Sequence, residues 1–182
     1  MSPRKPVIER DMSVEQLAGI VSGALTRHGI TAVMTGGAVV SIYTDNEYQS
    51  YDLDFITHAT GRQIEMALKG IGFSRKGRFY RHAETKYHIE FPAPPLEIGD
   101  MPIRTWTHRK TPAGTIHLLT PTQSVMDRLA SYYHWGDTQS LEQAVLVARR
   151  HKVDRREIRA WSIREGKLEA YRVFAERLKE SR

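Results

Sequence analysis

Residues 33–57 read VMTGGAVVSIYTDNEYQSYDLDFIT, and this stretch decides how the rest of the chain is interpreted. An apolar run ends at the pair Gly36-Gly37, and a second apolar run contains Asp52 and Asp54. Glycines favour a tight turn because they tolerate backbone angles that other residues avoid. The predicted elements are a buried strand at 30–34, a turn, a short helix at 38–43 and a second strand at 51–57.

The second predicted strand carries two carboxylates on one face. Side chains alternate along a strand, so Asp52 and Asp54 point the same way while Leu53 and Phe55 point to the core. Adjacent carboxylates repel each other, and a divalent cation such as Mg²⁺ relieves that repulsion through oxygen ligands. An Asp-x-Asp pair without other signals is more typical of a solvated strand face.

Three further features accompany the pair. Gly36 and Gly37 allow a phosphate to approach the backbone at a helix start, although they also suit a plain turn. Ser41 lies one helical turn further on. Its hydroxyl could donate a hydrogen bond to a phosphate, or it could be an ordinary hydroxyl on a helix surface. Glu90, in the segment YHIEF, faces away from its apolar neighbours. It joins the two aspartates if its strand pairs with theirs, and otherwise it is a surface carboxylate.

These pieces in this order resemble the nucleotidyltransferase superfamily, which includes DNA polymerase β and the minimal nucleotidyltransferases. The shared pattern is an apolar residue, Gly, Gly or Ser, a spacer, Asp-apolar-Asp-apolar, and a third acid on a later strand. GGAVV followed by SYDLDF is most similar to the branch with the AbiEii-type toxins of bacterial toxin–antitoxin and phage-abortive systems. Gln49 stands where that branch usually has Arg.

The resemblance implies transfer of NMP from an NTP to an acceptor hydroxyl. Two Mg²⁺ ions would be held by Asp52, Asp54 and Glu90, which would be the catalytic residues. Glu90 would also help to deprotonate the attacking hydroxyl. The nucleotide-binding residues would be Gly36, Gly37, Ser41 and Arg128. Asp127 would hold Arg128 in place, although a surface ion pair is the alternative for these two residues.

The remaining pattern predicts an α/β (α+β) fold, in which a nucleotidyltransferase-like mixed sheet flanked by helices precedes a C-terminal helical bundle. The change falls at Thr120-Pro121, which is typical of a capped helix start. We therefore divide the chain into an α/β domain (1–120) and a helical region (121–182). Further strands are predicted at 73–80, 86–91, 103–108 and 115–119. Helices are predicted at 14–28, 61–69, 121–134, 141–150, 154–161 and 167–179.

Charge and composition limit the kinds of binding partner that we expect. The chain has 27 Lys and Arg against 21 Asp and Glu, a net charge of +6, which suits a polyanion or merely a basic surface. RNA such as tRNA, or a protein, is the expected acceptor. The densest basic segment would steer the acceptor, unless this segment is only a solvated hairpin tip. Its cations are Arg75, Lys76, Arg78, Arg81 and Lys86.

Cysteine is absent, which excludes disulfides and Cys-ligated zinc. No apolar run reaches the roughly 20 residues of a membrane span, so no membrane partner is expected. No secretory signal is visible either, and a cytoplasmic protein is expected.

Three functions remain open. The first is the Mg²⁺-dependent enzyme, which the resemblance to the AbiEii-type branch would make a toxin with an antitoxin partner. The second is a non-catalytic nucleotide- or partner-binding module with the same fold. The third is a metal phosphohydrolase, for which His ligands would be expected. Three aromatic side chains could stack on a base or belong to the core; they are Tyr132, Tyr133 and Trp135.

Overall fold

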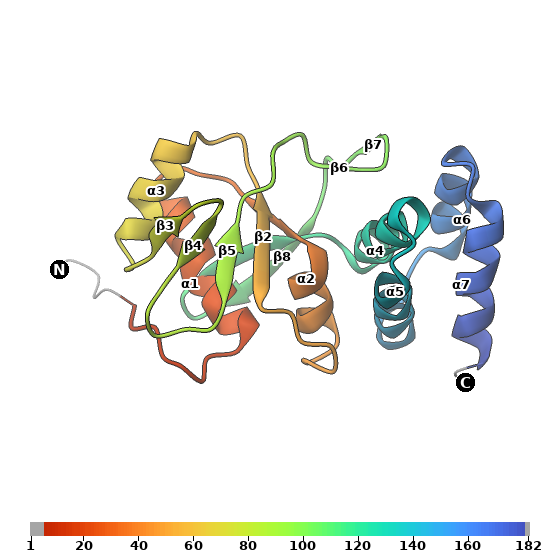
Figure 1. Ribbon diagram of the computed structural model, residues 1–182, viewed down its shortest axis with the longest axis horizontal. Coiled ribbons are helices and arrows are strands. Elements are labelled where there is room, and N and C mark those ends of the chain that lie inside the picture. Colours follow the sequence, from red (N-terminus) through yellow and green to blue (C-terminus); the bar gives the residue numbers. More distant parts are fainter. Residues whose placement is uncertain (1–5, 181–182) are drawn as a thin grey trace.

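A mixed β-sheet and three helices are formed by residues 6–120, and residues 121–180 form helices alone (Figure 1). The computed structural model describes residues 6–180, and within them the main sheet has the strand order β3–β4–β5–β2–β1–β9–β8. Its strands are β1 (Val33–Thr35), β2 (Asp52–Ile56), β3 (Ser74–Lys76), β4 (Phe79–Arg81), β5 (His88–Glu90), β8 (Thr107–Thr111) and β9 (Gly114–Leu118). A separate small hairpin pairs β6 (Glu97–Ile98) with β7 (Met101–Pro102).

Most helices begin at the caps that the sequence indicates. The helices are α1 (Val14–Arg27), α2 (Gly36–Tyr43), α3 (Gly61–Lys69), α4 (Pro121–Trp135), α5 (Thr138–Arg150), α6 (Arg155–Arg164) and α7 (Leu168–Glu180). Ser13 and Thr120 each accept a hydrogen bond from the backbone N–H three residues on, which completes a capping box. Asp137 and Asp154 cap α5 and α6 in the same way.

The buried face of the sheet is the predicted one. Leu53 and Phe55 of β2 are fully buried, and so is Ile89 of β5. Helix α1 packs on β9 and α3, and α2 packs on β2. The predicted fold class, a mixed α/β sheet followed by a helical bundle, is confirmed by this arrangement.

Two predicted strands were wrong in their bounds. The predicted strand 73–80 is broken by a turn at Gly77, which has a φ of +63°, and becomes the hairpin β3–β4. The predicted strand 103–108 is displaced towards the turn, because β8 pairs with β9 from Thr107 to Thr111. In both cases the position of the turn, and not the apolar pattern, determines which residues form backbone hydrogen bonds between the strands.

The helical half is docked on α2, which packs against α4 and α5 (Figure 1). The Tyr43 hydroxyl donates to the carbonyl of Leu119 (2.8 Å), and His151 Nε2–H donates to the carbonyl of Tyr43 (2.6 Å). Arg150 pairs with Glu47 in the loop after α2. The start of α4 at Pro121 lies at the boundary between the predicted α/β domain (1–120) and the predicted helical region (121–182), and this division stays a prediction.

None of the helices between residues 6 and 180 has the length and apolarity that a membrane crossing requires.

Candidate active site

Strand pairing brings the three predicted acids onto one face of the sheet. Strands β2 and β5 run parallel, with Asp52 opposite His88 and Asp54 opposite Glu90. Because neighbouring strands in register point matching side chains the same way, Asp52, Asp54 and Glu90 share the face opposite the buried Leu53. The condition set by the sequence, that the strand of Glu90 pairs with that of the aspartates, is met.

The surroundings of Asp54 disfavour its ionised form. Burial, followed by the charges of Glu90 and Asp52, raises the pKa of Asp54 from 3.8 to about 6. Asp127 adds to the increase, while Arg128 opposes it. Several acids thus crowd one half-buried carboxylate, and a bound cation would relieve their repulsion.

The other two acids are paired with basic side chains. Asp52 lies against His88 Nε2, and Glu90 Oε1 lies 3.3 Å from Nε of Arg78. In the described part of the chain, no group of three His, Cys, Asp or Glu side chains is arranged to hold a metal ion. The carboxylate oxygens suit Mg²⁺ in kind and in charge, but the side chains would have to turn away from Arg78 and His88 to hold it together.

Gly36 lies close to Asp54 of the sheet and to Asp127 of the helical part. Gly36 has a φ of +73°, and a Cβ atom there would lie 2.6 Å from Oδ2 of Asp54. Its N–H donates to Oδ2 of Asp127 in α4 at 3.2 Å. The close approach to Asp54 and the positive φ both require glycine at this position.

Asp127 and Arg128 form a largely buried pair beside this turn. Arg128 donates to Oδ2 of Asp127 through Nη2 (2.7 Å) and Nε (3.1 Å), and its side chain is only 16% exposed. Burial opposes the charge, yet Asp127 and Asp54 raise the pKa of Arg128. One carboxylate oxygen therefore accepts from both groups that the resemblance assigns to phosphate, the Gly36 N–H and the Arg128 guanidinium.

Gly37 and Ser41 shape the loop that follows α2. A Cβ atom at Gly37 would lie 3.2 Å from Ser50 Oγ and 3.3 Å from Tyr48 Cε1. The Ser41 side chain is fully buried, donates to the Gly37 carbonyl (3.3 Å) and accepts from the Ser50 N–H (2.8 Å). A phosphate contact by Ser41 would therefore require its hydroxyl to change partner.

Sequence reasoning placed Asp127 beside Arg128 but missed its contact with Gly36, and it missed Tyr48. The contact of Asp127 with Gly36 joins positions 91 residues apart, so no local pattern could reveal it. Tyr48 packs on Gly37; burial raises the pKa of its phenol, which Arg128 opposes and Asp52 reinforces. A tyrosine in the polar loop 44–50 was the available signal.

The aromatic side chains of α4 divide between core and surface. Tyr133 is buried, stacks on Trp161 with ring centroids 5.5 Å apart, and lies 2.9 Å from the Ser162 hydroxyl. Trp135 is 85% exposed. Tyr133 therefore belongs to the core, and base stacking is open only to Trp135 and the partly buried Tyr132.

An apolar pocket of about 570 Å³ lies at the other end of β2. Its lining includes Ile56 and Trp106, and His58 is its one titratable residue. Asp52 and Ile56 are the first and last residues of β2, so this pocket is separate from the acids.

Comparisons with known proteins define the fold. No protein-family model and no curated protein matches the chain. An antigenic nucleotidyltransferase-like protein from Paracoccidioides brasiliensis matches with a TM-score of 0.56 at 16% identity, over 76% of this chain and 77% of that one. ANT(2″)-Ia in complex with adenylyl-2″-tobramycin gives a TM-score of 0.48 at 12% identity, over 89% and 97%. The first likeness shows a nucleotidyltransferase-like fold, and function has to be argued from the site.

Proposed function

We propose that this protein is a Mg²⁺-dependent nucleotidyltransferase that moves NMP from an NTP to an acceptor hydroxyl. The observation that carries the proposal is the position of Asp52, Asp54 and Glu90 on one sheet face, beside the Gly36 turn. Crowded carboxylates next to a backbone N–H and a buried arginine suit a metal-bound triphosphate. The nucleotidyltransferase-like fold supports the same assignment.

Each side chain has a defined part in this reaction. Asp52, Asp54 and Glu90 would hold Mg²⁺, which would stabilise the charge on the transferred phosphoryl group and on the leaving pyrophosphate. The acceptor hydroxyl oxygen would attack the α-phosphorus as its proton passes to Glu90. The bond from the α-phosphorus to the pyrophosphate oxygen would break. Nucleotide binding falls to Gly36, Gly37, Ser41 and Arg128.

Asp127 accepts hydrogen bonds from two of the groups that are proposed to bind phosphate. Its Oδ2 accepts from the Gly36 N–H and from two nitrogens of Arg128. We expect the triphosphate to take these donors from Asp127 when it binds, since phosphate oxygens and carboxylates compete for the same charge-assisted hydrogen bonds.

The test is a transfer assay with purified protein, Mg²⁺, labelled NTPs and total RNA or protein as acceptor. Wild-type protein should label an acceptor, and Asp54→Ala should abolish the label. Asp11→Asn, an exposed acid far along the chain from the site, should behave as wild type. Equal labelling by wild type and Asp54→Ala would remove the proposal.

The toxin role rests on the resemblance of GGAVV and SYDLDF to the AbiEii-type branch. If it is correct, expression in a bacterial host should arrest growth, and Asp54→Ala should relieve the arrest. Co-expression of a neighbouring antitoxin gene should also relieve it. Normal growth with active wild-type protein would limit the proposal to the transfer reaction.

The second candidate is a non-catalytic nucleotide- or partner-binding module. It is favoured by the pairing of Asp52 with His88 and of Glu90 with Arg78. Nucleotide binding by calorimetry without transfer to any acceptor would support this module, and Mg²⁺-dependent transfer would exclude it.

A further inference from the structure

The sheet face that carries the acids continues outward over the hairpin β3–β4. Phe79 lies opposite Glu90, and Lys76 lies opposite Phe79. The neighbouring row places Arg81 opposite His88, which is opposite Asp52. Since residues in register share a face, Phe79 and Arg81 of β4 and Lys76 of the edge strand β3 extend the face of the acids to the edge of the sheet.

This extension is strongly cationic. Residues 74–86 hold five Lys and Arg side chains and a single acid, Glu84, which pairs with Arg10. All five cationic residues are exposed. We call Lys76, Arg78 and Arg81 the hairpin cations, because Lys76 and Arg81 share the face of the acids and Arg78 pairs with Glu90. Arg75 is opposite the buried Tyr80 and lies on the other face.

Two of the hairpin cations, Arg78 and Arg81, lie over the ring of Phe79. The Arg78 and Arg81 guanidinium carbons lie 4.8 and 5.7 Å from the centre of the Phe79 ring. Cations that track a backbone, together with rings and guanidinium planes that stack on bases, are the means by which proteins bind single-stranded nucleic acid.

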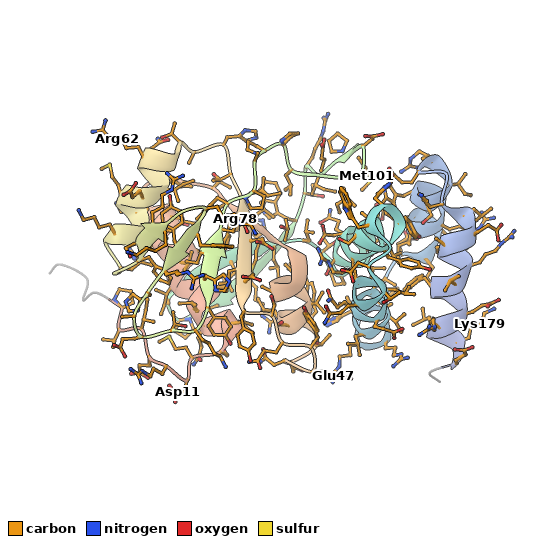
Figure 2. All side chains as sticks on the ribbon, in the orientation of Figure 1. Asp11, Glu47, Arg62, Arg78, Met101 and Lys179 are labelled. Atoms are coloured by element: carbon orange, nitrogen blue, oxygen red, sulfur yellow. The ribbon has the colours of Figure 1, made fainter. Side chains whose placement is uncertain are left out.

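Arg78 connects this surface to the acids. It lies over β5 and β2 in Figure 2 and pairs with Glu90 at 3.3 Å, while its side chain is 74% exposed. An ion pair so exposed contributes little to stability and exchanges readily. A phosphate that took over Arg78 would release Glu90 at the place where an acceptor hydroxyl must arrive.

We propose that the hairpin cations and Phe79 form the acceptor-binding surface, and that the acceptor is a single-stranded nucleic acid whose terminal hydroxyl reaches Glu90. The inference rests on the proposed transfer function and names its acceptor class and its point of entry. The strip of positive charge selects against polycationic acceptors, because like charges repel at short distance.

Binding of a fluorescent single-stranded oligoribonucleotide of about ten nucleotides tests the surface without any turnover. The triple variant Lys76→Glu, Arg78→Glu, Arg81→Glu should weaken binding at least about tenfold and reduce the slope of log affinity against log salt by about 2, the loss of three phosphate contacts. The matched control, Arg62→Glu, Lys110→Glu, Arg159→Glu, makes the same change in net charge at exposed positions of α3, β8 and α6. It should keep the wild-type slope. Circular dichroism confirms that both triple variants are folded.

Two results would overturn the inference: equal losses in both triple variants, or tighter binding of spermine or of a polypeptide acceptor than of the oligoribonucleotide. Failure of the proposed function looks different. If no transfer occurs but the hairpin variant alone loses RNA binding, the surface stands without the enzyme. If transfer occurs and the hairpin variant transfers as wild type does, the enzyme stands and the acceptor surface is wrong.

Discussion

At the scale of single residues, Asp54 combines a structural cost with the proposed function. Its carboxylate is half-buried, borders the Gly36 turn and stands among Glu90, Asp52 and Asp127. These surroundings raise the pKa of Asp54 to about 6, so they penalise the ionised form that metal chemistry would need. Catalytic acids often lie in sites that destabilise a free ionised carboxylate and stabilise one that is bound to a cation.

The pKa of Asp54 predicts a pH dependence of stability. The folded pKa of about 6 exceeds the unfolded value of 3.8, so the stabilising contribution is complete below about 3.8 and is lost as the pH rises through about 6. Asp54→Asn removes this loss. At about pH 8 the variant should be more stable than wild type by up to about 3 kcal/mol, and at about pH 4 the two should be alike.

Urea unfolding at both pH values measures the difference, with Asp11→Asn as the control that should follow wild type. A constant difference between Asp54→Asn and wild type at all pH values would show that Asp54 has an ordinary pKa. Added Mg²⁺ should stabilise wild-type protein at about pH 8 and leave Asp54→Asn unchanged.

Asp127 gives a second residue-scale prediction. If its carboxylate competes with phosphate for the Gly36 N–H and Arg128, Asp127→Asn should bind tripolyphosphate more tightly without metal, by roughly tenfold, or about 1.4 kcal/mol. Calorimetric titration measures this affinity. Weaker binding by the variant would show that Asp127 holds Arg128 in place and does not compete.

At the scale of elements, the junction between β1 and α2 leaves no room for a side chain at Gly36. Gly36 and Gly29 have nearly the same φ, +73° and +70°, but only Gly36 faces a neighbouring atom. Both positions penalise alanine by roughly 1–2 kcal/mol for the left-handed backbone. Gly36 adds the collision with the Asp54 carboxylate, and overpacking costs roughly 1–3 kcal/mol more.

Gly36→Ala should therefore lose about 2–5 kcal/mol of unfolding free energy and all detectable nucleotide binding, whereas Gly29→Ala should lose only about 1–2 kcal/mol and keep binding. Chemical denaturation and nucleotide titration of the two variants provide the comparison. Equal losses at both positions would mean that the approach of Gly36 to Asp54 is not a tight contact in solution.

At the scale of the whole molecule, the candidate site joins both halves. α2 packs on α4 and α5, and Gly36 is bonded to Asp127 across this joint. Asp127 and Arg128 belong to the helical half, while the acids belong to the sheet. Any relative movement of the two halves would therefore change the positions of the groups that are proposed to bind phosphate.

This joint predicts cooperative unfolding. Because Tyr43 contacts Leu119 and His151 inside it, the backbone amides of β2 and α5 should exchange hydrogen with the same free energy and the same denaturant dependence. Hydrogen exchange followed by mass spectrometry measures both. Separate free energies for the sheet and for α4–α7 would instead support two independent domains that meet at residue 120.

The sequence predicts most of the order of elements and the face on which the acids lie, but it does not predict the hairpin β6–β7. Alternation placed Asp52 and Asp54 opposite Leu53 and Phe55, and caps such as Thr120 gave helix starts, because both depend on neighbouring residues only. Strand bounds around Gly77 and Thr107 were less predictable, since turn position and pairing partners decide them.

Only the tertiary structure decided what surrounds the glycine pair of VMTGGAVV and the carboxylates of SYDLDF. The sheet order puts Glu90 beside Asp54, the docking of α4 puts Asp127 on Gly36, and the hairpin puts Arg78 on Glu90. These contacts join segments that are distant in sequence, so they depend on packing of the whole chain and leave no local pattern. They turn a pair of aspartates into a crowded acidic site with a buried arginine on one side and a cationic surface on the other.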